Sequence, residues 1–276
     1  MLASRGSSAK AAGSSQVRAG AWRINIHAPA DVTRSLHSVL SSITIPELNL
    51  PPLNVFISDD GLVQGTINGK TEWTMTLPRR GWIGPILSYT VATATSLLRE
   101  FHFVHAGAVG INGRGYVLVG PSGAGKTTAV AVLLRRGATY LSDEVALLHP
   151  KTGTVHPFIL PMAVKPWTAK AIGPLPPNRL VASDARIQYL LPERLAQEPV
   201  PLDSLVLLDP TRPATEIEEY PRAEMLLAIS ENPSSFHYRH RLEASFSAFV
   251  QLIKQARCLR VGSANPAQAV NVLLSR

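Results

Sequence analysis

The chain has 276 residues, of which 45% are hydrophobic and 17% charged, and this composition is typical of a globular protein with a substantial core. No apolar run is long enough to span a membrane, and the one cysteine, Cys258, excludes an intrachain disulfide and any multi-cysteine metal site. The net charge of +8 favours anionic partners, but the basic residues form no block with interleaved aromatics. We therefore expect a cytoplasmic protein that binds neither nucleic acid nor a membrane.

The first part of the chain predicts a tail followed by a sheet. Residues 1–20 are rich in Ser, Ala and Gly, and we expect a disordered tail there. Strand-like segments follow between Trp22 and Leu77, with turn signals at Asp59–Gly61 and Asn68–Gly69. This pattern predicts a β-rich N-terminal region with an antiparallel sheet over residues 21–80.

The remainder, residues 81–276, opens with a helix expected from about Pro85 to Arg99 and a strand from Phe101 to Gly110. Asn112–Gly113 is a strong hairpin signal, so this strand should run antiparallel to the next one, which begins near Gly115. Such an antiparallel neighbour is a departure from the parallel βα units that flank most P-loop strands.

The segment that follows, with the sequence GPSGAGKT, has the spacing G-x-x-x-x-G-K-[ST] of a phosphate-binding P-loop. Glycines at this spacing let backbone N–H groups close around phosphate oxygens, and the helix expected from Thr127 to Arg136 presents its N-terminus to them. The ammonium group of Lys126 would reach the β- and γ-phosphates, and the Thr127 hydroxyl would ligate magnesium. The residues expected to hold the nucleotide are Gly120, Pro121, Ser122, Gly123, Ala124, Gly125, Lys126, Thr127 and Thr128.

Two aspartates compete to be the acidic partner of this loop. Asp143, with Glu144 beside it, ends the short strand after the P-loop helix, which in a right-handed βαβ unit should lie close to the P-loop strand. Asp209 follows the apolar run Leu205–Leu208 and matches the form of a Walker B element, although Asp209-Pro210 also reads as a turn that ends a strand. We favour Asp143 over Asp209.

The C-terminal half begins with a proline-rich stretch, residues 157–192, which we expect to form irregular loops around the site. A buried strand is expected at Leu205–Leu208, and helices at Arg222–Ser230, Glu243–Arg257 and Pro266–Leu274.

His105 lies on the strand expected beside the P-loop strand. A histidine there is either a structural residue or a group that donates to a phosphate oxygen or relays a proton near neutral pH.

Four segments of the chain resemble the catalytic core of the HPr kinase/phosphorylase family in their order and spacing. They are His105–Val109, the P-loop, Arg136–Ala138 and Leu141–Val145. The resemblance covers about residues 101–150, and more loosely the rest to the C-terminus. It implies an α/β fold in which residues 81–276 form a P-loop kinase core of HPr kinase type with a mixed sheet, beside the small N-terminal antiparallel β region.

The resemblance also implies roles for single residues. Asp143 would act as general base toward a serine hydroxyl, Lys126 and Thr127 would bind phosphate and magnesium, and His105 would lie beside the phosphates. Asp143, Lys126 and His105 are therefore the expected catalytic residues, and Thr127, Asp143 and Glu144 the expected metal ligands.

The chain departs from the family in one segment. The glycine-rich segment that engages HPr and supports phosphorolysis in the family has no counterpart here, and the proline-rich stretch takes its place. Relatives of similar length are found in peptide natural-product pathways of the lasso-peptide type, where some resemble kinases of a precursor peptide's C-terminal serine. We therefore expect a kinase that uses ATP and Mg²⁺ and phosphorylates a serine of a peptide or small protein. A small-molecule kinase and a nucleotide-binding regulatory module without transfer activity are the alternatives, and the oligomeric state is left open.

Overall fold

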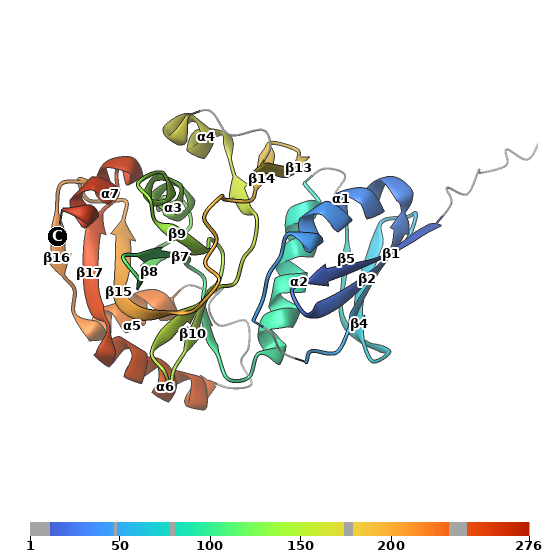
Figure 1. The fold of residues 1–276 in the computed structure, drawn as a ribbon, viewed down its shortest axis with the longest axis horizontal. Helices are drawn as coiled ribbons and strands as arrows, with labels where there is room; N and C mark the ends of the chain where they lie inside the picture. Colours follow the sequence, from blue (N-terminus) through green and yellow to red (C-terminus); the bar gives the residue numbers. More distant parts are fainter. Residues whose placement is uncertain (1–11, 47–48, 78–80, 174–178, 232–241, 276) are drawn as a thin grey trace, which may run out of the picture.

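The computed structural model describes residues 12–46, 49–77, 81–173, 179–231 and 242–275. They form an α/β structure in which an N-terminal sheet and a larger mixed sheet lie on either side of the long helix α2 (Ile83–Leu97) (Figure 1). No helix in these ranges is long and apolar enough to cross a membrane.

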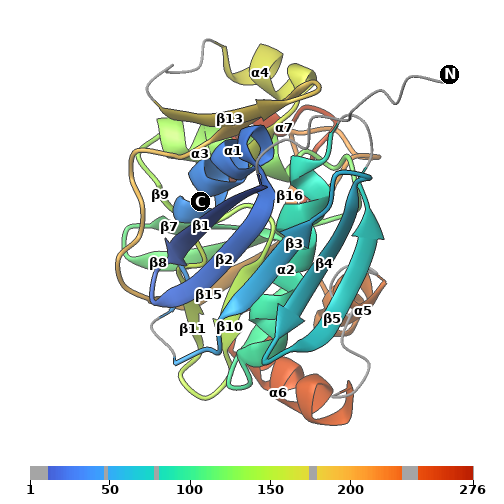
Figure 2. The same ribbon diagram turned by 90° about the vertical axis from the view of Figure 1, so that its right-hand side faces the viewer.

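The N-terminal sheet has the strand order β1-β2-β3-β4-β5, and its broad face covers α2 (Figure 2). Its strands are β1 (Ala12–Ala19), β2 (Trp22–Pro29), β3 (Leu53–Ile57), β4 (Leu62–Ile67) and β5 (Lys70–Thr76). The sheet is antiparallel, as predicted, except that β2 and β3 pair in parallel through the crossover helix α1 (Ala30–Ser41). Alternate residues of β2 are buried, as the period of a half-covered strand requires.

The prediction of a disordered tail over residues 1–20 is wrong for residues 12–19, which form β1 and pair along their whole length with β2. The hairpin places Val17 in the core, where it is 2% exposed. Burial of such residues and the ladder of backbone hydrogen bonds outweigh a composition that is typical of a flexible segment. Residues 1–11 lie outside the described ranges.

The larger sheet has nine strands in the described residues and carries the P-loop. They are β6 (His102–Val104), β7 (Gly107–Ile111), β8 (Arg114–Val119), β9 (Thr139–Ser142), β10 (Ala146–His149), β11 (Thr154–His156), β15 (Val200–Asp209), β16 (Ile217–Glu219) and β17 (Arg257–Gly262). The main order is β6-β10-β11-β15-β8-β7-β9, with β17 beside β15 and β16 beside β17. β8 therefore has a parallel neighbour, β15, and an antiparallel neighbour, β7.

The predicted hairpin is confirmed: β7 and β8 are antiparallel and meet at Asn112 and Gly113, whose φ angles of 50° and 75° suit a tight turn. The single strand expected from Phe101 to Gly110 is wrong, since β6 and β7 are separate strands that pair with different partners. The strand β9 pairs with β7, so it is one strand further from β8 than expected.

Helices cover both faces of the larger sheet. The core on one face includes residues of α3 (Lys126–Arg135) and α7 (Pro266–Leu274), and the core on the other includes residues of α5 (Arg222–Ser230) and α6 (Leu242–Gln255). The predictions for the C-terminal helices are confirmed, except that α6 ends before Arg257, where the unpredicted strand β17 begins. Neighbouring residues of β15 point to opposite cores: Val206 packs with α3 and α7, and Leu205 with α5 and α6.

The proline-rich stretch is more regular than predicted. It contains a three-stranded sheet in the order β12-β14-β13 and a short helix. Its elements are β12 (Met162–Val164), α4 (Pro166–Ile172), β13 (Leu180–Asp184) and β14 (Ile187–Leu190). The prediction of irregular loops is wrong here because prolines occur at the ends of elements, as Pro166 does at the start of α4, where a missing N–H costs nothing. Pro174, Pro176 and Pro177 lie outside the described residues.

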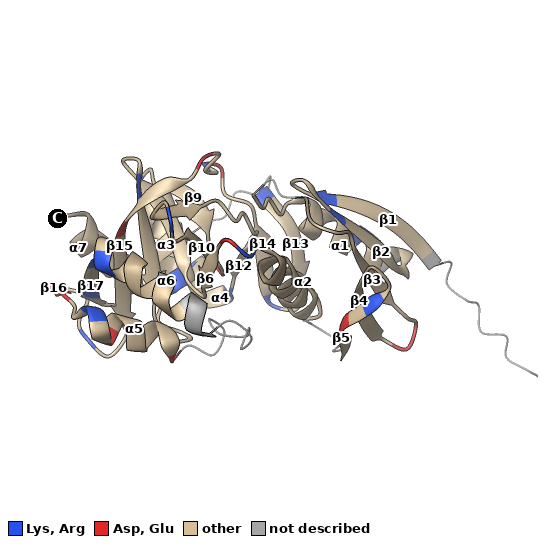
Figure 3. Ribbon diagram, turned by 90° about the horizontal axis from the view of Figure 1, so that it is seen from below, with Lys and Arg blue, Asp and Glu red and all other residues tan. Residues whose placement is uncertain are grey.

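The helix α2 holds the two sheets together (Figure 3). On one side it packs on the N-terminal sheet, where Trp73 Nε1 donates to Thr93 Oγ1 at 3.0 Å. At its start the carboxylate of Asp184 accepts hydrogen bonds from the backbone N–H groups of Gly81 and Ile83, at 2.9 and 2.8 Å. The bond to Ile83 satisfies a donor that the first turn of a helix leaves unpaired, and the bond to Gly81 holds the segment that enters the helix. The three-stranded sheet is thereby fastened to α2, and one hydrophobic core extends from Trp22 to Tyr189.

Candidate active site

The P-loop connects the end of β8 at Val119 to the start of α3 at Lys126. Gly120 and Gly125 have backbone φ angles of 150° and 90°, which residues other than glycine rarely adopt. A Cβ at Gly120 would lie 2.8 Å from the carbonyl oxygen of Leu208, and a Cβ at Gly125 would lie 2.2 Å from Cγ of Pro266. Both glycines are therefore needed for the loop to sit closely against β15 and the start of α7.

A buried hydrogen bond holds the same loop from the C-terminal side. Ser263 Oγ donates to the carbonyl oxygen of Ala124 at 3.0 Å. Ser263 follows β17, and its own backbone N–H donates to the carbonyl oxygen of Asp209 at 2.7 Å. The P-loop is therefore held in part by Ser263, which lies 139 residues beyond Ala124 in the chain.

Lys126 is the first residue of α3, and its side chain turns back over the loop. Its ammonium nitrogen donates to the carbonyl oxygens of Gly120 and Pro121 at 2.8 and 3.2 Å. The side chain is largely buried, and this burial lowers its pKa, while the charges of Glu144 and Asp143 act in the opposite direction. The lysine thus faces an acidic pair across the mouth of the loop.

Asp143 follows β9 and is 2% exposed. Neither carboxylate oxygen has a well-formed hydrogen bond to any of the described residues. Burial, and after it the charge of Glu144, raise its pKa well above the usual range, while the nearby Thr127 hydroxyl and the ammonium of Lys126 oppose this. The Thr127 hydroxyl lies close enough to this carboxylate to lower its pKa, but not in the geometry of a full hydrogen bond. A buried carboxylate in this state is costly unless something binds it.

Asp143 approaches the P-loop although β7 separates β9 from β8, and Gly107 of β7 makes this approach possible. A Cβ at Gly107 would lie 2.5 Å from Cγ2 of Val130 in α3 and 3.8 Å from Oδ1 of Asp143. Without a side chain at this position, α3 packs closely on β7, and the carboxylate lies next to the first turn of α3.

His105 lies between β6 and β7 and forms a pair with Glu144. Its Nδ1 is 3.3 Å from Oε2 of Glu144. Burial lowers the pKa of His105, the charge of Glu144 raises it, and the ammonium of Lys126 lowers it. The net lowering favours a neutral imidazole near pH 7. The structure therefore brings His105, Lys126, Asp143, Glu144 and Thr127 together.

Thr128 and Lys165 lie differently from what the sequence predicted for the site. The Thr128 hydroxyl shares a 3.2 Å hydrogen bond with the hydroxyl of Thr168 in α4, so this side chain is directed to α4. Lys165, the residue before α4, was not predicted, yet its charge acts on both Lys126 and Asp143. Nothing local in the sequence marks Lys165, because only the packing of α4 on α3 brings it to the site.

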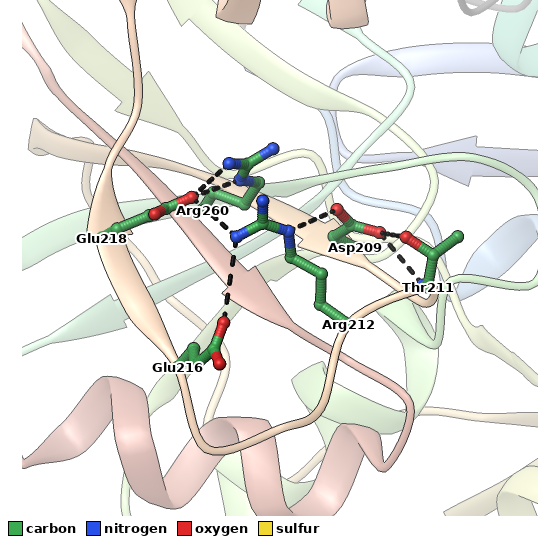
Figure 4. Close-up of polar contacts among 6 residues, drawn as sticks. All are labelled: Asp209, Thr211, Arg212, Glu216, Glu218 and Arg260. Carbon is green, nitrogen blue, oxygen red and sulfur yellow. Dashed lines mark hydrogen bonds and ion pairs between the residues drawn. The ribbon is translucent and has the colours of Figure 1, made fainter.

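Asp209 lies at the end of β15 and is engaged in a turn and a charge network (Figure 4). Its Oδ1 accepts from the Thr211 backbone N–H and hydroxyl at 3.0 and 2.6 Å, and its Oδ2 is 3.6 Å from Nε of Arg212. Arg212 also pairs with Glu216 and Glu218, and Arg260 with Glu218. Burial would raise the pKa of Asp209, but the hydrogen bonds from Thr211 outweigh it and lower the pKa. These partners favour the strand-ending turn over a Walker B role.

Comparisons with known proteins add little to this geometry. No protein-family model matches the chain, and no curated protein matches its sequence. A solved structure described as the Hpr(Ser) kinase/phosphatase from Coxiella burnetii is similar over 63% of this chain and 95% of that chain. The identity is 11% and the TM-score 0.27, values too low to support a functional assignment.

Proposed function

We propose that the chain is a kinase that uses ATP and Mg²⁺ to phosphorylate a serine hydroxyl of a peptide or small protein. The observation that carries the proposal is the buried carboxylate of Asp143, which lacks hydrogen-bond partners among the described residues and lies beside Lys126 and Thr127 at the start of the P-loop helix. A structural role would be expected to satisfy such a group. A metal ion or an acceptor hydroxyl at this point would satisfy it.

Nucleotide binding is supported by the shape of the loop. The N-terminus of α3 offers backbone N–H groups and a positive dipole to an anion. The positive φ angles of the loop require glycines, and because glycine has no side chain the cradle stays open to phosphate. The carbonyl contacts of Lys126 hold its ammonium over the loop. Phosphate oxygens of ATP would replace these carbonyls as its partners.

The residues also fit a magnesium ion. Mg²⁺ prefers hard oxygen ligands and is usually held by one or two carboxylates together with substrate phosphates. The carboxylate of Asp143 and the hydroxyl of Thr127 supply such oxygens, and Glu144 stands beside them. In the described part of the chain no three His, Cys, Asp or Glu side chains gather as a metal site. The bound ion would neutralise charge on the phosphates.

In the proposed reaction Asp143 accepts the proton of the serine hydroxyl as its oxygen bonds to the γ-phosphorus. The bond between the γ-phosphorus and the bridging oxygen to the β-phosphate breaks, and ADP leaves. The place of Asp143 beside Lys126 and Thr127 suits a base toward a hydroxyl that approaches the γ-phosphate. Lys126 and the imidazole of His105, held by Glu144, would stabilise charge on the transferred group.

We further propose that the enzyme lacks efficient phosphorylase activity. Phosphorolysis requires a site that holds inorganic phosphate in line with phosphoserine, and the glycine-rich segment linked to that activity in the resembled family has no counterpart here. Incubation of a phosphorylated peptide with excess inorganic phosphate, followed by pyrophosphate detection, tests this. Rapid pyrophosphate release would contradict it.

The central experiment offers ATP and Mg²⁺ with a panel of serine peptides, small proteins and hydroxylated metabolites, and detects products by mass spectrometry. We expect phosphoserine in a peptide or protein. Transfer to metabolites alone would instead identify a small-molecule kinase. Tight ATP binding without transfer to any acceptor would identify a nucleotide-binding regulatory module.

A further inference from the structure

A cavity of about 320 Å³ lies between α2 and the three-stranded sheet, next to His105 and Glu144. The wall formed by α2 includes Ser88, Val91 and Ala92, which recur at the spacing of one helix face. The volume is at the lower end of the range of about 300–1,000 Å³ that is typical of ligand pockets.

The cavity has an apolar body and a polar end. Val145 and Leu160 form part of the body opposite α2, and the polar end is made by His105, Glu144 and Lys165. Glu144 and Lys165 are also the groups whose charges act on Lys126 and Asp143. The polar end therefore adjoins the place where the γ-phosphate is expected.

The helix α2 has apolar residues on two opposite sides and no charged residue in its fifteen positions. One side packs on the N-terminal sheet, where Ile86 and Ala94 are at most 1% exposed. The other side carries Val91 and Ala92, which are only half-buried at the cavity. Apolar surface of this kind gains free energy when a ligand covers it.

We propose that this cavity is the acceptor pocket and that it receives a bulky apolar side chain close to the phosphorylated serine of an extended peptide. The inference rests on the proposed kinase function and narrows its substrate class. With an apolar side chain in the body of the cavity, the neighbouring serine would lie at the polar end, beside Glu144, which directly follows Asp143 in the chain.

Two further features suit a peptide rather than a compact metabolite. Tyr189 lies in the cavity wall, and burial first, then the charges of Asp184 and Glu144, raise the pKa of its phenol to about 12. A phenol is protonated at neutral pH with or without this shift, so Tyr189 offers an O–H donor to a peptide carbonyl at the cavity wall. Ser88 and Lys165 are exposed residues of the lining, so the rest of a chain could continue into solvent.

A matched pair of substitutions on α2 tests the pocket. Ser88 and Ser96 are both exposed, but only Ser88 lines the cavity. Ser88→Leu would fill the pocket, and we expect it to raise the KM for an apolar serine peptide by about tenfold or more while changing the Kd for ATP by less than about twofold. Ser96→Leu should change neither value. If Ser88→Leu weakens ATP binding, the cavity holds the adenine base of the nucleotide and the proposal is wrong. An unchanged KM for the peptide would also overturn it.

A labelling experiment gives a readout that does not depend on transfer. The native Cys258 is 3% exposed and burial raises its pKa, so Ser88→Cys and Ser96→Cys each introduce one reactive thiol. The probes are short glycine-rich peptides with one serine and one phenylalanine, placed in turn at each flanking position, and the control peptide lacks phenylalanine. We expect at least one phenylalanine peptide to slow maleimide labelling of Ser88→Cys severalfold, with no effect on Ser96→Cys.

The two readouts separate the two proposals. Phosphorylation of serine peptides without protection of the Ser88→Cys thiol would support the kinase and overturn the acceptor pocket. Protection without phosphorylation would support a peptide pocket and overturn the kinase proposal.

Discussion

The ammonium nitrogen of Lys126 lies 2.8 Å from the carbonyl oxygen of Gly120, so the lysine of the P-loop is bound to the first residue of its own loop. This contact closes the loop over the place where phosphates are expected. The lysine is partly desolvated and its pKa is lowered, which means that its charge is poorly compensated in this arrangement. Phosphate oxygens would be better partners for this charge than two carbonyl oxygens.

Replacing Lys126 by alanine should therefore remove ATP binding and leave the fold intact. Among the described residues this side chain makes two hydrogen bonds, both to carbonyl oxygens, and a typical one contributes only about 1 kcal/mol. Titration calorimetry with ATP and Mg²⁺ gives the affinity, and circular dichroism follows the fold. Lys170→Ala, at an exposed lysine of α4, is the control. Normal turnover in a folded Lys126→Ala variant would reject the P-loop assignment.

The glycines of the loop allow a second matched comparison. Gly123 and Gly125 have similar φ angles, 85° and 90°, but a Cβ at Gly123 meets nothing within 4 Å, whereas a Cβ at Gly125 meets Pro266 at 2.2 Å. Gly123→Ala should cost about 1–2 kcal/mol of unfolding free energy from backbone strain alone. Gly125→Ala should cost clearly more, because α7 must also move. Urea denaturation of both variants measures this, and equal losses would show that Pro266 does not hold the loop.

Local signals predicted much of this structure. The Asn112–Gly113 turn predicted the β7–β8 hairpin, and the apolar period predicted α5 and α7 to the residue. The P-loop spacing predicted a strand, a loop and a helix because glycine and lysine have specific local tasks there. In each case the information lies within a few neighbouring residues.

Features that depend on distant segments were missed. The strand β17 is a short apolar segment for which no element was predicted, and its parallel pairing with β15 depends on a distant part of the chain. Placing Asp143 next to α3 depends on Gly107 of β7, and placing Lys165 depends on α4. The cavity beside α2 needs the N-terminal sheet to cover the opposite side of that helix. None of these relationships has a signature within one stretch of sequence.

The pH dependence of stability should reveal the state of Asp143. Its folded pKa is raised above the unfolded value, so between these two values the native state binds more protons than the unfolded state. The contribution of this group to stability must therefore fall as the pH rises from the ordinary pKa of an aspartate to the raised one, and stay low above it. Asp143→Asn cannot ionise and should be more stable than wild type above this window, by about 1 kcal/mol or more.

This difference is measured by urea denaturation of both proteins between pH 4 and about pH 8, without nucleotide and with metal ions removed. Other titrating groups are shared by the two proteins and cancel in the difference. A difference in unfolding free energy that is independent of pH, or that favours wild type as the pH rises, would show that Asp143 is compensated in the folded protein.

The two aspartates that compete for the catalytic role should respond in opposite ways to the same substitution. Asp143→Asn should lower phosphoryl transfer by ~10²-fold or more, the usual scale for the loss of a positioned base, while the protein stays folded. Asp209→Asn should leave transfer within about threefold of wild type, because its carboxylate faces Thr211 and Arg212. Asp209→Asn should instead lower the free energy of unfolding, since a hydrogen bond to a charged group contributes about 1.5–3 kcal/mol.

Single-turnover assays with saturating ATP and Mg²⁺, together with urea denaturation, separate these effects. Measuring transfer at several pH values adds a control. The rise of the transfer rate with pH that reflects ionisation of the base should disappear in Asp143→Asn and persist in Asp209→Asn. If Asp209→Asn is inactive and Asp143→Asn remains active, Asp209 is the acidic partner in a Walker B arrangement. The unpartnered oxygens of Asp143 would then need another explanation, and the assignment of Thr127, Lys126 and Asp143 to one transfer site would be wrong.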